Sequence, residues 1–132
     1  MKRSTLFCLL LATSLLPACR TTRLVSPKPV APAPTTAATR EAILLAMEQN
    51  DGLLKAEEPG VIHARRDIGS KHSLTVAITW DEQQVALAYE ASRNLKYHRT
   101  ERGRETIHKN YMIWVKELMR AIKSETARLR KK

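Results

Sequence analysis

The sequence predicts an α+β domain with an N-terminal helix, a four-stranded antiparallel meander and a long C-terminal helix, both helices packed on one sheet face. Three observations lead to this fold class. Apolar residues recur at helical spacing near residues 40–51 and again over residues 105–129. Between these segments, apolar and polar residues alternate with a period of two, as in half-buried strands. The connections there are too short for crossover helices, so neighbouring strands should run antiparallel.

The first helix should begin near Thr39, whose side chain is a favourable N-cap. Ile43, Met47 and Leu54 fall on its apolar face. Asp51-Gly52 is a suitable end, because glycine accepts the left-handed backbone conformation that closes many helices.

Four segments are expected to form the strands of the meander. The clearest alternation is that of Leu74, Val76 and Ile78 with polar or small residues. Pro59-Gly60 is typical of the centre of a type II turn, since proline presets φ and glycine accepts a positive φ. The expected strands cover residues 53–57, 61–68, 73–80 and 85–89.

A long helix is expected from about Glu105 to Leu129, after a charged connection over residues 92–104. We expect its Trp114, and Trp80 at the end of a strand, to lie in the core. The apolar stripe of this helix consists of Ile107, Tyr111, Trp114, Leu118, Ile122 and Leu129, widened by Val115 and Met119.

Residues 1–18 have the pattern of an export signal that ends at a cysteine. Two basic residues precede the apolar run LFCLLLATSLL, which is shorter than the roughly 20 residues that a bilayer span needs. The ending Leu16-Pro17-Ala18-Cys19 resembles a lipobox, in which the cysteine receives diacylglycerol and becomes the mature N-terminus. The sequence therefore predicts a lipoprotein anchored at Cys19; the alternative is ordinary secretory cleavage beside an incidental cysteine.

Residues 19–39 are expected to be the lipidated cysteine and a tether, and residues 40–132 the folded domain. Prolines and small residues over 20–39 favour extended conformations that build no core. At about 3.1 Å per residue, such a tether would reach up to about 60 Å from the membrane. Arg20 stands where an aspartate would signal retention in the inner membrane, so the outer membrane is expected, with the domain in the periplasm.

The chain has a formal net charge of +10 at pH 7, and its basic residues are clustered. Such density attracts polyanions. Behind an export signal, lipid head groups, lipopolysaccharide or an acidic protein are expected rather than nucleic acid. One cluster is Arg93, Lys96, Arg99, Arg102, Arg104 and Lys109; a second is Lys116, Arg120, Lys123, Arg128, Arg130, Lys131 and Lys132.

Several motifs of the folded part are distinctive. They are Glu58-x-Gly60-x-Ile62, His72, Tyr89-x-x-Ser92-x-Asn94-Leu95-x-Tyr97 and Ile107-His108-x-Asn110-Tyr111-x-x-Trp114-Val115. In these motifs the sequence resembles a group of small, uncharacterised lipoproteins of Gram-negative bacteria. The resemblance covers roughly residues 40–122 and implies no catalytic residues. The group often has an asparagine where this chain has Met112, and a tryptophan near the end of the first helix, where this chain has Leu53.

A set of polar residues brackets the charged connection and is the candidate partner-binding site. These side chains either line a small pocket or tie the loop to its helix, because buried polar groups need partners. The pattern contains no esterase elbow and no zinc-protease motif, and the four histidines lack a metal-ligand spacing, so neither an enzyme, a metal nor a cofactor is expected. The candidate residues are Ser92, Asn94, Tyr97, His108, Asn110 and Tyr111.

Together these features favour a non-enzymatic lipoprotein of the cell envelope, a membrane-tethered module that binds or assembles with a protein, lipid or glycan. One alternative is electrostatic docking on anionic lipid or lipopolysaccharide through Arg93, Lys96, Arg99, Arg102 and Arg104. The other is an envelope enzyme that uses the polar residues of the loop.

Overall fold

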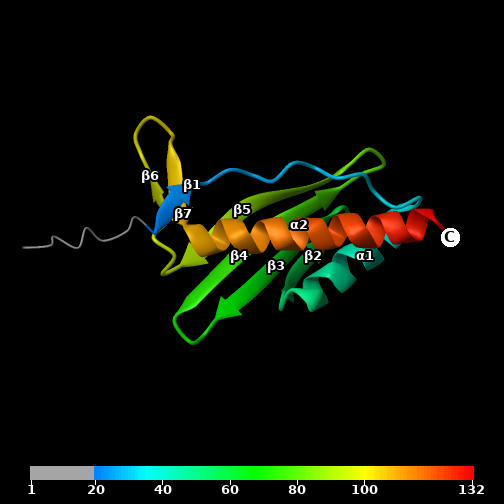
Figure 1. The fold of residues 1–132 in the computed structure, drawn as a ribbon, viewed down its shortest axis with the longest axis horizontal. Coiled ribbons are helices and arrows are strands. Elements are labelled where there is room, and N and C mark those ends of the chain that lie inside the picture. The colour runs from blue at the N-terminus through cyan, green and yellow to red at the C-terminus, as the bar shows by residue number, and fades with distance from the viewer. Residues whose placement is uncertain (1–19) are drawn as a thin grey trace, which may run out of the picture.

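The computed structural model describes residues 20–132, which form two helices and two antiparallel sheets (Figure 1). This is the predicted α+β class. The helices are α1 (Thr36–Gln49) and α2 (Lys109–Arg130). One sheet has the order β2 (Leu53–Glu58), β3 (Val61–Ile68), β4 (His72–Trp80) and β5 (Val85–Arg93). The other has the order β1 (Thr21–Arg23), β7 (Glu105–His108) and β6 (His98–Arg99).

The four-stranded sheet is the predicted meander, and its apolar face lies against the helices (Figure 1). Leu74, Val76 and Ile78 of β4 are fully buried, as their alternation predicts. Gly60 has φ of 76°, so the expected glycine conformation in the β2–β3 turn is confirmed. Trp80 is half-buried and packs against the edge of the core.

The small sheet was not predicted, and it corrects two boundaries. The sequence pattern places residues 21–23 in the tether and residues 105–108 in the long helix, yet Thr22 pairs with Ile107 in an antiparallel ladder. The helix therefore begins at Lys109. The side chain of His108 caps it, because its Nδ1 accepts the N–H of Asn110 at 3.2 Å.

The chain between β1 and α1 runs along the length of the molecule instead of leaving it (Figure 1). Val30 and Val85 exchange two backbone hydrogen bonds, of 3.0 and 2.8 Å. Farther on, the Arg130 guanidinium donates to the carbonyl of Pro32 at 2.8 Å and to that of Ala31 at 3.3 Å. The folded unit therefore includes the residues that the sequence assigned to a free tether.

The first helix begins four residues earlier than expected. Thr35 is its N-cap and accepts the N–H of Ala38. Thr39, the predicted cap, is buried, and its hydroxyl accepts the N–H of Ala33 at 3.0 Å. This contact folds the end of the incoming segment onto α1.

The end of α1 also differs from expectation. Asp51, and not Gly52, takes the positive φ, at 58°. Gly52 instead lies so close to Met47 that a Cβ at this position would stand 3.2 Å from the Met47 side chain. Leu54, expected on the apolar face, is 50% exposed on the edge strand β2.

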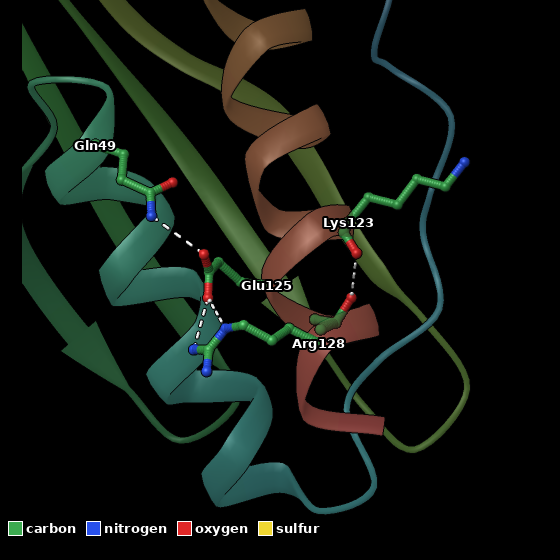
Figure 2. A network of polar contacts seen from close by, with 5 residues as sticks. Gln49, Lys123, Glu125 and Arg128 are labelled. Atoms are coloured by element: carbon green, nitrogen blue, oxygen red, sulfur yellow. Dashed lines mark hydrogen bonds and ion pairs between the residues drawn. The ribbon is translucent and has the colours of Figure 1, made fainter. Parts of the chain in front are cut away.

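Polar contacts join the two helices near the C-terminus (Figure 2). Gln49 of α1 donates to Glu125 of α2 at 3.1 Å, and Arg128 donates to the same carboxylate at 2.8 and 2.9 Å. The hydrogen bond from Arg128, and then that from Gln49, lower the pKa of Glu125. Neither α1 nor α2, the helices of residues 20–132, is long and apolar enough to span a membrane.

Trp114 carries the largest fully buried side chain, and we expect its loss to be severe. Its indole N–H donates to the carbonyl of Asn50 at 2.8 Å, and the guanidinium of Arg66 lies 5.7 Å from the ring centroid. Trp114→Ala should lower the free energy of unfolding by about 3–5 kcal/mol, as truncation of a buried aromatic residue does. Urea denaturation measures it, with the neighbouring exposed Ile113→Ala as control. An unchanged denaturation midpoint for Trp114→Ala would contradict this packing.

Candidate functional site

The loop after β5 is bound to the fold through its backbone. Asn94 and Lys96 both have positive φ, 57° and 54°, and Leu95 between them is buried. The Leu95 carbonyl accepts the N–H of His108 at 2.8 Å. The Asn94 side chain donates to the carbonyl of Lys71 at 2.6 Å. The left-handed backbone conformations of Asn94 and Lys96 thus direct the side chain of Leu95 into the core. These conformations cost free energy, which the burial and the hydrogen bonds offset.

Three tyrosines, one each from β5, the loop and α2, pack together. Tyr97 stacks on Tyr89 with centroids 4.5 Å apart, and Tyr111 meets the Tyr89 ring edge-on at 5.7 Å. The hydroxyls of Tyr89 and Ser92 are 2.9 Å apart. Tyr97 donates to Glu105 at 2.6 Å, which raises the pKa of the Tyr97 phenol, and burial raises that of Tyr111.

The structure brings Ser92, Asn94, Tyr97, His108 and Tyr111 to one region around the loop. Asn110 is separate: it is exposed and lines a hollow beside Arg66 and Trp114. The side chains of Asn94 and Tyr97 hold the loop to the β3–β4 turn and to β7. Ser92 pairs with Tyr89 within β5, and the His108 ring caps α2. Of the two interpretations that the sequence left open, these contacts support the one in which the residues tie the loop to its helix.

His108 sits among cations as well as capping α2. Burial lowers the pKa of its imidazole first, and the positive charges of Lys96, Arg20 and Lys109 and the ring of His72 lower it further. The neutral ring is also the form that accepts the Asn110 N–H. Basic side chains from three separate segments therefore converge on this end of the fold.

We call this region the basic end. Its members come from β1, the loop, the β6–β7 hairpin and the start of α2, and all are exposed. None of them takes part in an ion pair within residues 20–132. Tyr97 and Glu105 are hydrogen-bonded to each other at its border. The basic end consists of Arg20, Arg23, Lys96, Arg99, Arg102, Arg104 and Lys109.

The sequence found most of this surface but not all of it. Arg20 and Arg23 were missed because a three-residue strand has too few residues to show a period. Arg93, which was predicted to belong, lies at the end of β5 and donates to the carbonyl of Ser70 at 3.0 Å.

The second basic cluster runs along α2, away from the basic end, to the C-terminus. Helix α2 has 22 residues, so about 33 Å separates its ends at 1.5 Å per residue. The C-terminus is at the opposite end of the molecule from β6 and β7 (Figure 1). Arg128 and Arg130 are also engaged, with Glu125 and with the carbonyls of residues 31 and 32. The part of the second cluster at residues 128–132 is therefore far from the basic end.

A shallow hollow of about 620 Å³ opens between the start of α1 and the β2–β3 turn, beside Trp80. An ion pair between Arg40 and Glu57 crosses it, and this hydrogen bond lowers the pKa of Glu57. Within residues 20–132, no three histidine, cysteine or acidic side chains are grouped as metal ligands.

Comparison of the chain with family models, with curated proteins and with solved structures gives no match. The predicted lipidation site, Cys19, and the signal segment before it lie outside the described residues. The function is therefore inferred from the surface itself, on which the seven exposed basic residues of the basic end form no ion pair within residues 20–132.

Acid should destabilise the protein partly through His108. Because the pKa of His108 is lower in the folded protein than the unfolded value of about 6.5, the unfolded chain binds the proton more tightly. This contribution is complete above about pH 6.5 and is lost as the pH falls below that value. His108→Asn keeps a good N-cap without the titration. Its midpoint in thermal melts should fall less than that of the parent between pH 7 and pH 5; equal falls would contradict this role.

Proposed function

We propose that the protein is a non-enzymatic lipoprotein of the bacterial outer membrane whose periplasmic domain binds phosphate-bearing lipid head groups through its basic end. One observation carries the proposal: unpaired basic residues surround the point at which the chain enters the fold directly after Cys19. The export pattern, the lipobox and the resemblance to envelope lipoproteins support the location.

The energetics favour such docking. Each basic side chain near an anionic surface contributes about 1 kcal/mol, so a few of the basic-end residues acting together give measurable binding. The lipid at Cys19 would hold the domain at a high local concentration beside the bilayer, so even weak contacts would be occupied. The attraction should fall as salt rises, because the Debye length is only about 8 Å at physiological ionic strength.

The hydrogen bonds of the polar residues around the loop favour a binding function over a catalytic one. An envelope enzyme would need a free nucleophile or base there. Ser92 instead pairs with Tyr89, Tyr97 with Glu105, and His108 with the backbone of α2. Each of these side chains therefore already has a partner within the fold.

A second candidate is an assembly module whose partner is an envelope protein or glycan. The hollow beside Trp80 favours it, because this hollow combines a tryptophan with Arg40 of α1 and two glutamates at the end of β2. A photo-reactive residue placed at Glu58, in this hollow, tests the idea in intact cells. A specific cross-link that Trp80→Ala abolishes would support it.

Lipidation at Cys19 predicts a mature protein that carries acyl chains and sediments with outer membranes. Cys19→Ala should release the domain into the soluble periplasm at physiological salt, because neither helix of residues 20–132 can span a membrane. Intact-mass measurement and membrane fractionation check both points. An acyl-free mature protein, or recovery with the inner membrane, would contradict the proposed anchor or its location.

Charge reversal in the β6–β7 hairpin should abolish docking. The test is co-sedimentation of residues 20–132 with vesicles containing phosphatidylglycerol or, separately, lipopolysaccharide, at low and physiological salt. The parent should bind at low salt, and the triple variant Arg99→Glu, Arg102→Glu, Arg104→Glu should not.

The matched control is Lys116→Glu, Arg120→Glu, Lys123→Glu, which makes the same change in net charge on the exposed face of α2. It should retain most of the binding. Equal losses in the two variants would show that net charge alone attracts the domain. Absence of parent binding at low salt to both kinds of vesicle would contradict the proposal.

A further inference from the structure

We propose that residues 20–35 form a fixed mount that stands the domain on the bilayer, with the basic end against the membrane surface and the Trp80 hollow pointing away from it. This inference rests on the proposed lipidation of Cys19. The partner is the bilayer in which the chain's own anchor is embedded, and the mount differs from a spacer because it sets the orientation of the domain.

The anchor position leaves almost no free chain. One peptide bond joins Cys19 to Arg20, and consecutive Cα atoms are about 3.8 Å apart. The Arg20 carbonyl already accepts the N–H of Lys109 at 2.8 Å. The β1 strand follows, and the N–H of Leu24 donates to the carbonyl of Glu105 at 3.0 Å. A lipid on Cys19 would therefore be held beside the small sheet.

The rest of the segment is bound as well, at points spread along the molecule. Val30 exchanges two hydrogen bonds with Val85, and Arg130 holds the carbonyls of Ala31 and Pro32. The Ala33 N–H donates to the buried Thr39 hydroxyl. The prolines in this stretch preset φ, so that fixing the segment costs less conformational entropy. A segment bound at β7, β5, α2 and α1 cannot act as a swinging arm.

The orientation of the domain follows from which end of the molecule carries the anchor. β1, β6 and β7 lie at one end of the molecule, and the C-terminus lies at the other (Figure 1). Helix α2 connects the two ends over about 33 Å. The basic residues therefore meet the head groups first, where charge complementarity favours them. The start of α1 and the Trp80 hollow are held away from the bilayer, open to the periplasm.

Depth measurements on the lipidated protein test the mount independently of charge. In the lipidated protein, cleavage of the signal would have removed Cys8, and acylation would block the thiol of Cys19. An introduced cysteine would then be the only free thiol. A fluorophore is attached at Glu101→Cys, in the β6–β7 turn, or at Gln83→Cys, in the β4–β5 turn toward the other end (Figure 1). The vesicles are pure phosphatidylcholine with a head-group quencher. The label at 101 should lose most of its fluorescence, and that at 83 should lose little.

The control inserts a flexible Gly-Ser segment of roughly 20 residues, spanning about 25 Å, between Cys19 and Arg20. On these neutral vesicles, the insertion should abolish the difference between the two labels. Equal quenching at both positions without the insertion, or an unchanged difference with it, would overturn the mount. The proposed docking can fail without the mount. If residues 20–132 do not bind anionic vesicles, but the labels at 101 and 83 are quenched to different extents on neutral vesicles, the docking is contradicted and the mount is supported.

Discussion

The pairing of β1 with β7 is the constraint on which the arrangement depends. It joins the first described residues to the strand that leads directly into α2, although more than eighty positions separate Thr22 from Ile107 in the sequence. The same short strand fixes the polar loop, because His108 donates its N–H to the carbonyl of Leu95. Entry of the chain, closure of the loop and start of the long helix are thus set at one place.

This constraint also decides where the charge is found. Arg20 and Arg23 join a basic hairpin only because β1 lies beside β7, and Lys109 is added because α2 begins there. The ring of Tyr89, which stacks on Tyr97 and meets Tyr111 edge-on, packs where the chain enters this hairpin. The polar side chains nearby are hydrogen-bonded to one another. The groups of this end that remain available to a partner are therefore its basic side chains. A membrane-anchored domain with such an end is suited to a phosphate-bearing surface.

The sequence predicted what periodicity and packing determine. Leu74, Val76 and Ile78 alternate clearly enough to be placed in the core, and the stripe around Trp114 is buried as expected except at its end, where Leu129 is only partly buried. Periodicity did not reveal β1 or β7, because three or four residues carry no period and their pairing is non-local. The position of Ile107 fits both the apolar stripe of a helix and a buried position of a strand. Only its pairing with Thr22 of β1 decides that it lies in a strand. Asn110 was assigned to the candidate site by its place in the motif, yet it lies on another flank of α2.

The most direct test of the account is amide hydrogen exchange on residues 20–132, read at Leu24, Val25 and Val30. Leu24 and Val30 donate to the carbonyls of Glu105 and Val85, whereas Val25 is 53% exposed and has no backbone acceptor among the described residues. The account predicts that the amides of Leu24 and Val30 exchange far more slowly than that of Val25. Exchange of all three at the rate of an unfolded chain would show that the segment is a free tether, and would contradict the fixed entry of the chain on which both the basic end and the mount depend.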